Sequence, residues 1–418
     1  MASAKRKHLK MKTVQQKVKL FRANEPLLSV FMWGINHTIN ELSHIPVPVM
    51  LMPDDFKAFT KVRKDNHLYN NTLACNTIFW ENMPSHFKVK EYCPMVFRNL
   101  RERFGVDDID YMNSLTKQPV EMDSPGRSGA RMLLSQDKKY FIKTLVSEEV
   151  EQMHHILKQY HSYIVERHAQ TLLPQYLGMY RITVNDVETY LVVLRNVFSP
   201  RLTIHKKYDL KGSTVDRQAS DKEKAKDLPT LKDNDFVNDG VIIHIGAAEK
   251  DIFMKKLNAD TEFLAGLHLM DYSLIVGIHD CEKAEQEAFE AQLEAEAEAE
   301  NGENADGEAD DGLLEEEEIN DVMGSVPTPP DSPQTFVGQP FTGEVDPKIE
   351  IFGIKSGKED KQIIYFLAMI DILTKYGMKK RTAQAAKTVK HGSGAEISTV
   401  RPDQYAKRFL EFIERSIE

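Results

Sequence analysis

Two aspartates in apolar surroundings are the most informative chemical groups of this sequence. Asp271 lies in the run Met270–Gly277, and Asp371 lies about 100 residues later in Ala368–Leu373. Both runs have the composition of β-strands, and a carboxylate buried among Ile, Leu and Met is costly unless it meets a cation, a metal ion or a hydrogen-bond donor. Two such carboxylates indicate a shared charged ligand, for which magnesium-bound phosphate is the natural candidate.

Lys143 adds a positive charge to this set. It ends the strand-like run Lys139–Lys143, so its stem is expected to be buried and its ammonium free to reach a phosphate. Phosphoryl transfer requires a Lys on the nucleotide phosphates, an Asp that carries magnesium and a carboxylate that orients the attacking hydroxyl. Asp371 suits the magnesium role and Asp271 the catalytic role. An ordinary edge-strand Lys and two structural Asp remain the alternatives at this point.

The elements on either side of Lys143 follow the order strand, strand, helix, as in a kinase amino-terminal lobe. Before it, the small-residue turn Ser124–Ala130 contains Ser128 and Gly129 and lets the backbone approach a phosphate. After it, a helix is predicted to begin at Ser147. Apolar residues then repeat at helical spacing: Val150, Met153, Ile156, Leu157, Tyr160 and Ile164.

A hinge between two lobes is predicted after a second apolar run. Tyr190–Leu194 is apolar throughout, so it must be buried on both faces or packed under a helix. The run ends at Arg195, Asn196 and Val197, and residues just past such a strand are where the hinge of a kinase would lie.

The negative charge of the chain is concentrated in one segment. The net charge is −10 over 418 residues. Between Glu282 and Asp321 there are 18 Asp or Glu against one Lys, a local charge of −17, which leaves +7 for the rest. Such a run cannot bury a core, so a disordered or transiently helical insert is predicted over residues 282–345. Thr328 and Ser332 within it precede Pro and are either sites of regulatory phosphorylation or plain linker residues.

Composition excludes several classes of protein. No run approaches 18 apolar residues and the first residues lack the apolar region of a signal peptide, so a cytosolic protein is expected. Cys75, Cys93 and Cys281 are widely spaced, which argues for reduced thiols rather than a disulfide framework or a zinc knuckle. The basic body has no zinc, RRM or KH pattern and no alternation of basic and aromatic residues, so no nucleic-acid partner is expected.

Segments across nearly the whole chain carry a family resemblance. The most specific are Glu91–Arg101, Lys207–Thr214 and Leu269–Leu274, within a similarity that extends from Gln16 to Val400. They resemble the phosphatidylinositol phosphate kinases, and in particular the type II branch, the phosphatidylinositol 5-phosphate 4-kinases. The resemblance implies an α+β, two-lobed fold, with an antiparallel amino-terminal sheet, helices and a smaller carboxyl-terminal lobe.

The resemblance also implies a role for each candidate residue. Lys143 would be the phosphate-binding Lys, Asp271 the catalytic-loop Asp and Asp371 the magnesium Asp, with ATP and Mg²⁺ as cofactors. The implied nucleotide site includes Ser128 and Gly129 of the small-residue turn. Its other residues are Lys143, Arg195, Asn196, Val197 and Lys207. The usual HRD and DFG motifs of protein kinases are absent, which argues against a protein substrate.

Substrate choice is expected to depend on the segment Lys379–Gly392, which resembles the activation loop of the family. Type I enzymes carry Glu at the position of Ala383 and type II enzymes carry Ala, so the resemblance implies phosphatidylinositol 5-phosphate as the substrate. The loop is cationic and would approach an anionic leaflet, although a merely solvated basic loop is the alternative. The residues expected to contact substrate or membrane are Lys211, Ala383, Lys387 and Lys390.

One segment and two single residues depart from the family pattern. The segment Asn71–Trp80 is an addition between two matching stretches and contributes apolar side chains to a connection. Leu194 stands where several relatives carry Thr beside the base, so the resemblance does not extend to the use of GTP alongside ATP. Gln384 replaces the usual His near the substrate loop.

These features define the expected organisation and activity. A flexible basic amino terminus (1–15) precedes an amino-terminal lobe with a dimerisation surface (16–200) and a carboxyl-terminal lobe (201–418), which contains the insert and an activation loop (374–398).

The implied reaction transfers the γ-phosphate of ATP to the 4-hydroxyl of the lipid, and a low-activity phosphoinositide-binding scaffold that modulates related kinases is the alternative. The implied partners are anionic membranes, a second copy, related isoforms and type I kinases. The expected location is the cytoplasm with peripheral membrane association, and the nucleus is a further candidate.

Overall fold

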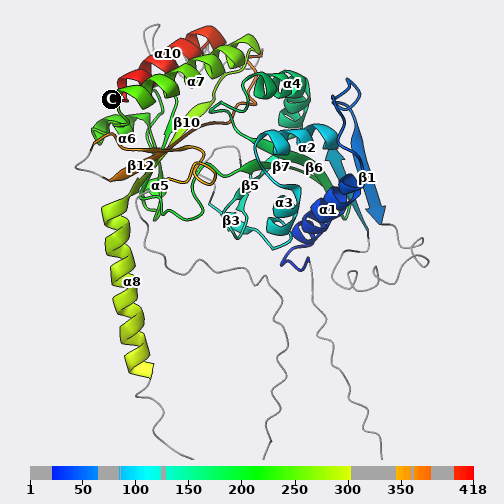
Figure 1. Ribbon diagram of the computed structural model, residues 1–418, viewed down its shortest axis with the longest axis horizontal. Helices are drawn as coiled ribbons and strands as arrows, with labels where there is room; N and C mark the ends of the chain where they lie inside the picture. Colours follow the sequence, from blue (N-terminus) through cyan, green and yellow to red (C-terminus); the bar gives the residue numbers. More distant parts are fainter. Residues whose placement is uncertain are drawn as a thin grey trace, which may run out of the picture.

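Two β-sheets, one from each half of the chain, lie side by side and form the frame of the molecule (Figure 1). The computed structural model describes residues 21–64, 84, 86–123, 129–302, 345–358, 362–377 and 400–418. Helices cover both sheets, so the fold is of the α+β, two-lobed kind that the sequence predicted. The expected lobe boundary at residue 200 falls between the last strand of the first sheet and the first strand of the second.

The first sheet has seven strands within the described residues, and all its pairs are antiparallel. Its spatial order is β1-β2-β6-β7-β5-β4-β3. The strands are β1 (Phe59–Lys64), β2 (Phe87–Tyr92), β3 (Val120–Met122), β4 (Met132–Leu134), β5 (Tyr140–Leu145), β6 (Tyr176–Val184) and β7 (Val187–Arg195). The apolar run before the predicted hinge forms the buried part of β7, and Lys143 lies within β5.

In the described part of the first lobe, four helices pack around this sheet: α1 (Pro26–Ser43), α2 (Pro94–Arg103), α3 (Asp108–Ser114) and α4 (Ser147–Glu166). The predicted start of α4 at Ser147 is confirmed, although Val146 is the N-cap. The Glu149 carboxylate accepts the Val146 N–H at 3.0 Å and so satisfies one of the free donors of the first turn. The apolar stripe of α4 is buried as expected, at Val150, Met153, Ile156, Leu157, Tyr160 and Ile164.

The second sheet carries the two aspartates of interest. Its spatial order is β11-β12-β10-β8-β9, and only the β8–β9 pair is parallel among its described pairs. The strands are β8 (Lys206–Leu210), β9 (Thr230–Lys232), β10 (Ser273–Asp280), β11 (Gly353–Lys355) and β12 (Ile363–Ile370). Nearly every residue of β10 and β12 is buried, because helices cover one face and the connection from the first lobe covers the other.

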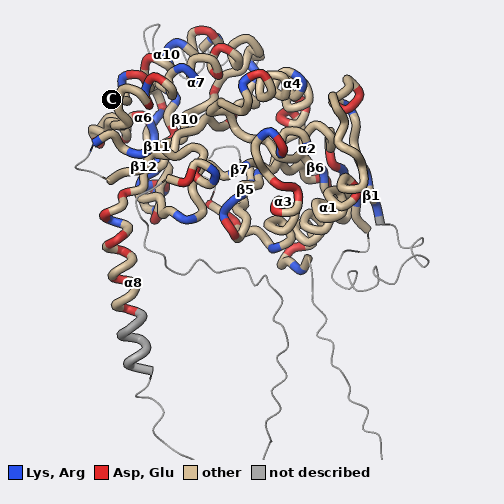
Figure 2. The backbone as a smooth tube through the Cα atoms, in the orientation of Figure 1, with Lys and Arg blue, Asp and Glu red and all other residues tan. Residues whose placement is uncertain are grey.

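The helices of the second lobe are α5 (Asp221–Lys224), α6 (Asp233–Asn238), α7 (Ala247–Gly266), α8 (Cys281–Gly302) and α10 (Pro402–Arg415). Helices α7 and α10 pack against each other over the sheet, whereas α8 runs away from the body (Figure 1). Acidic residues are spaced along the described part of α8, as their colour in Figure 2 shows. The first part of the predicted insert is therefore a helix, and residues 303–344, with Thr328 and Ser332, lie outside the described residues.

Two further sequence expectations can be compared with this fold. Cys93 and Cys281 are buried free thiols, whereas Cys75 falls outside the described ranges. None of the helices in the described ranges has the length and apolar character of a membrane-spanning segment.

Candidate active site

Asp271 and Asp371 lie at the same end of two neighbouring strands. Asp271 precedes β10 and Asp371 follows β12, and Ser273 of β10 pairs with Ile370 of β12. Both aspartates adopt left-handed backbone conformations, with φ of 64° and 59°. Short polar side chains tolerate this region better than other non-glycine residues. The chain therefore turns sharply at each carboxylate.

This geometry corrects the expectation that the two aspartates sit inside buried strands. The strand-like runs were assigned correctly, but each carboxylate lies just beyond a strand end. The side chain of Asp371 is 50% exposed, and Asp271 is partly exposed. A left-handed residue cannot continue the pleated ladder, so both side chains project beyond the end of the sheet rather than onto its buried face.

Lys143 of β5 joins the two lobes through an ion pair. Its ammonium donates to Asp371 Oδ1 at 2.8 Å and lies 3.7 Å from Glu149 Oε1. Burial alone would lower the pKa of Lys143, but the charges of Asp371 and Glu149 raise it above its ordinary value. Burial alone would raise the pKa of Asp371. The charge and hydrogen bond of Lys143, together with the charge of Lys211, hold that pKa below its usual value. Both groups are therefore charged at neutral pH.

Glu149 is a site residue that the sequence reasoning did not select. It lies in the first turn of α4, where it meets Lys143 as well as the Val146 N–H. An acidic residue near the start of the helix that follows the Lys143 strand was the available signal. That signal does not single out a functional residue, because acidic residues are favourable in the first turn of any helix.

Lys211 lies beside both aspartates. Its ammonium donates to the backbone carbonyl of Asp271 at 2.6 Å. Asp233 fixes the turn that carries Lys211, because its Oδ1 accepts the N–H groups of Lys211 and Gly212 at 2.9 and 2.7 Å. Asp233 is 1% exposed, and Arg217 donates to its other oxygen at 2.6 Å. This support places a second ammonium beside the two aspartates.

The predicted hinge leads from the end of β7, a central strand of the first sheet, to the face of the second sheet. Arg195 pairs with Tyr140 at the end of β7, and burial lowers the pKa of its guanidinium. Asn196 donates its backbone N–H to Lys139 O and its side-chain amide to Lys138 O, each at 2.9 Å. Val197 packs against the second sheet, where its apolar neighbours are Phe198, Ile275, Phe352, Ala368 and Ile370.

Lys207 lies on the strand next to this apolar surface. It pairs with Gly277 of β10, and a Cβ atom at Gly277 would come within 2.4 Å of the Phe198 ring. The ring and the glycine therefore fit directly against each other. Burial lowers the pKa of Lys207, while Glu223 raises it in part. The neighbouring positive charge of Lys226 adds to the lowering.

The small-residue turn is only partly described. Gly129 has φ of +66°, a conformation that glycine adopts at no steric cost. Two residues later, the Arg131 N–H donates to Thr144 Oγ1 at 2.8 Å, and Met132 of β4 pairs with Lys143. The turn therefore leads directly into the strand beside Lys143. The other predicted residues Ser128, Ala383, Lys387 and Lys390 lie outside the described residues.

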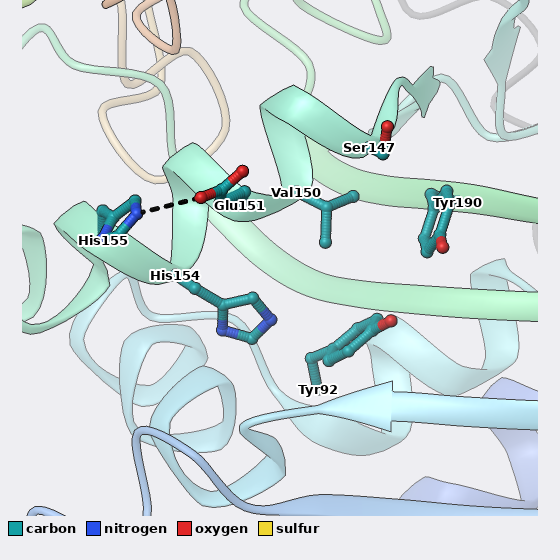
Figure 3. Close-up of a pocket in the computed structure, with 7 residues that line it drawn as sticks. All are labelled: Tyr92, Ser147, Val150, Glu151, His154, His155 and Tyr190. Atoms are coloured by element: carbon teal, nitrogen blue, oxygen red, sulfur yellow. Dashed lines mark hydrogen bonds and ion pairs between the residues drawn. The ribbon is translucent and has the colours of Figure 1, made fainter.

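Two cavities of about 360 Å³ each flank α4. One is lined by Tyr92, Ser147, Val150, Glu151, His154, His155 and Tyr190 (Figure 3). The rings of Tyr92 and His154 lie 5.0 Å apart there, while His155 turns toward Glu151. The second cavity lies between the first turns of α4 and residues 373–375, close to Asp371. Both cavities adjoin the helix that carries Glu149.

Asp371 is the described residue that best fits a magnesium ligand. Mg²⁺ is usually held by one or two carboxylates together with phosphate oxygens and water. Asp371 is ionised and half exposed at a strand end, as such a ligand must be. Within the described ranges there is no group of three His, Cys, Asp or Glu side chains that could hold a metal ion by themselves. Phosphate oxygens would therefore have to complete the coordination.

A lysine of one sheet that forms an ion pair with an aspartate at the end of a strand in a second sheet is typical of a two-lobed phosphotransferase of the kinase class. Residues 114–416 match the family model described as phosphatidylinositol-4-phosphate 5-kinase. The chain is 59% identical to phosphatidylinositol 5-phosphate 4-kinase type-2 alpha of Gallus gallus over 416 residues, 98% of this chain and 96% of that protein. It is also 59% identical to the type-2 beta protein of Homo sapiens over 405 residues, 96% and 92% of the two chains. The chain belongs to the phosphatidylinositol phosphate kinase family, in the type II branch, as the sequence resemblance predicted.

Proposed function

We propose that this protein transfers the γ-phosphoryl group of ATP to the 4-hydroxyl of phosphatidylinositol 5-phosphate and so makes phosphatidylinositol 4,5-bisphosphate. The names of the type-2 relatives, which match nearly the whole chain, support this reaction. The observation that carries the proposal is the ion pair between Lys143 and Asp371. It joins the two lobes at the point where a kinase must hold the nucleotide phosphates.

The mechanism follows from the charges around this pair. Lys143 binds phosphate oxygens of the nucleotide, and Asp371 would hold Mg²⁺, which would neutralise charge on the phosphates when bound. Asp271 orients the inositol 4-hydroxyl and accepts its proton as the oxygen attacks the γ-phosphorus. The new phosphorus–oxygen bond forms as the bond to the β-phosphate oxygen breaks, and ADP leaves. Lys211 stabilises the carbonyl of Asp271 and adds positive charge where the transferred group carries negative charge.

The nucleotide site extends from this pair to the hinge. The base lies against Arg195, Asn196 and Val197, and the phosphates extend past Lys207 toward Lys143 and Gly129. Apolar packing around Val197 and Phe198 supports this path, because an aromatic base requires an apolar surface with a few polar groups at its edge. Ser128, next to Gly129, completes the proposed turn over the phosphates.

Lipid binding completes the proposal. Lys211 contacts the substrate phosphate, and Ala383, Lys387 and Lys390 belong to the basic loop that selects the 5-phosphate lipid and meets the anionic leaflet. The protein would act at membranes as a peripheral homodimer. Related isoforms and type I kinases are further partners. The alternative of a low-activity scaffold is not favoured, because Lys143, Asp271 and Asp371 are all present and lie on elements that converge.

Transfer of labelled phosphate to two lipids tests this function. Purified protein with Mg²⁺ and labelled ATP should phosphorylate vesicles that contain phosphatidylinositol 5-phosphate in preference to the 4-phosphate lipid. Asp371→Asn should lose at least about 100-fold in kcat, since it removes the proposed metal ligand. Preference for the 4-phosphate lipid would overturn the type II assignment of substrate. Equal rates for wild type and Asp371→Asn would mean that the measured activity belongs to a contaminant.

A further inference from the structure

A buried carboxylate far from the catalytic pair connects both lobes. Asp260 of α7 is fully buried, with 0% exposure. It accepts three hydrogen bonds, from Tyr163 Oη at 2.6 Å, from Thr171 Oγ1 at 2.7 Å and from the Leu172 N–H at 2.7 Å. Three donors satisfy most of what a carboxylate requires in an apolar interior. All three donors come from the first lobe or its connection, whereas Asp260 itself belongs to the second.

One of these hydrogen bonds leads to the strand that ends at Asp371. The carbonyl of Leu172 accepts the Met369 N–H at 2.7 Å. Strand β11 pairs with β12 as far as Phe366, and the Leu367 N–H donates to Phe352 O at 3.1 Å, so Leu172 continues the hydrogen bonding along that edge of β12. Met369 lies two residues before Asp371. The backbone of Leu172 is therefore held on one side by Asp260 and on the other side holds the end of β12.

A second hydrogen bond leads to the helix that carries Glu149. Tyr163 lies near the end of α4, and its ring stacks on Phe263 of α7 at 4.2 Å between centroids in addition to its bond with Asp260. Glu149 lies at the start of the same helix, 3.7 Å from the Lys143 ammonium. A rigid helix transmits a displacement of one end to the other, so the tilt of α4 at Tyr163 affects the distance between Glu149 and Lys143.

We propose that Asp260 is a positioning residue for phosphoryl transfer, because it fixes both partners of Lys143 from one point. Through Leu172 and Met369 it fixes the strand end that bears Asp371, and through Tyr163 it fixes the helix that bears Glu149. This inference rests on the proposed function, since it assigns importance to the Lys143 ion pairs. A displacement of about 1 Å at a reacting group costs on the order of 100-fold in rate, so a hydrogen-bond anchor of this kind affects turnover more than binding.

The test compares three single substitutions in the full-length protein. Asp260→Asn keeps the shape but places an amide against one of the three donors, and Tyr163→Phe removes one hydroxyl. Tyr208→Phe is the matched control, because Tyr208 donates to Asp239 at 2.7 Å in the second lobe, away from β12 and α4. We expect kcat to fall about 10- to 100-fold in Asp260→Asn and about 3- to 10-fold in Tyr163→Phe, with the KM for ATP within about threefold of wild type. Tyr208→Phe should remain within about twofold of wild type.

Amide hydrogen exchange of the same variants separates positioning from general destabilisation and does not depend on turnover. In Asp260→Asn the amides of Leu172 and Met369 should exchange at least about tenfold faster than in wild type, while those of β10 keep their rates. Unchanged exchange at Met369, or an equal acceleration throughout the core, would overturn the inference. Loss of kcat no greater than in Tyr208→Phe would also overturn it. A wild-type protein without lipid kinase activity would refute the proposed function alone, and the exchange result would still decide whether Asp260 holds the end of β12.

Discussion

The ammonium of Lys211 donates to the backbone carbonyl of Asp271 at 2.6 Å. Asp271 has φ of 64°, so its peptide groups point in directions that a strand or helix would not use. A positive charge at this carbonyl stabilises the turn and remains close enough to lower the pKa of Asp371. One lysine therefore supports the conformation of one aspartate and the ionisation of the other.

Replacement of Lys211 should impair turnover severely. Lys211→Met removes the donor to Asp271 and one positive charge beside Asp371, and we expect kcat to fall about 100-fold, the usual effect of losing one charge-stabilising group. Initial rates at saturating ATP and lipid measure this effect. Lys206→Met is the matched control, because Lys206 is on the same strand region, 54% exposed, and pairs only loosely with Asp239 at 3.6 Å. A Lys211→Met enzyme within about threefold of wild type would contradict the assignment.

The Lys143–Asp371 ion pair should be insensitive to pH across the physiological range. The pKa of Asp371 is lowered from 3.8, so its stabilising charge is present above that value and is lost only as pH falls through the lowered pKa. The pKa of Lys143 is raised from 10.5, so its charge is lost only as pH rises above that value. The difference in melting temperature between wild type and Asp371→Asn should therefore stay constant between about pH 5 and pH 9. A difference that changes within this range would show that another group titrates with the pair.

The contact between Gly277 and Phe198 should control nucleotide binding. A side chain at Gly277 meets the packed Phe198 ring at 2.4 Å, and displacement of that ring moves the hinge residues beside it. We expect Gly277→Val to raise the KM for ATP about tenfold or more, with a smaller change in kcat. Gly266→Ala is the control, since nothing lies within 4 Å of a Cβ atom at Gly266. An unchanged KM in Gly277→Val would place the nucleotide away from this surface.

Glu91 should make the stability of the first lobe depend on pH. It is fully buried in β2, and burial raises its pKa from 4.5 to about 7, an effect that the charge of Arg101 offsets only in part. A raised pKa means that the folded state holds a proton that the unfolded state has released, so stability falls as pH rises from about 4.5 to 7. The shift corresponds to a difference on the order of 3 kcal/mol.

Urea unfolding of wild type and Glu91→Gln at about pH 5 and pH 8 measures this contribution. The free energy of unfolding of wild type should decrease relative to that of Glu91→Gln between the two pH values, because the neutral amide cannot ionise. Other titrating groups contribute equally to both proteins and cancel in the comparison. Parallel pH dependence of the two proteins would mean that Glu91 does not change its protonation on unfolding.

The local elements of this protein could be predicted from sequence because their signals are periodic. The stripe from Val150 to Ile164 indicated α4, and the apolar run Tyr190–Leu194 indicated β7. Strand-like apolar runs also indicated Asp271 and Asp371 as candidate site residues. Their positions just beyond the strand ends could not be predicted, since left-handed conformations at single non-glycine residues depend on contacts such as that of Lys211.

The supporting residues of the site were not predictable in the same way. Asp233 and Asp260 are ordinary acidic residues in helical sequence, and nothing in their neighbourhoods distinguishes them from solvent-exposed ones. Asp260 meets Leu172 across 88 positions of the chain, and Lys143 meets Asp371 across 228. Hydrogen bonds between such distant segments become visible only when the two lobes are assembled.

The long connection between β10 and β12 leaves the sheet at the end opposite the two aspartates. Asp280 pairs with Ile363 where the connection begins and ends, and the Cys281 N–H donates to Gln362 O. Strands β10 and β12 are therefore hydrogen-bonded to each other up to this base of the connection. Eight residues of strand separate this base from the carboxylates, a span of about 25 Å. Because this span separates the connection from the two aspartates, a reporter domain inserted between α8 and β11 is expected to leave the chemistry in place.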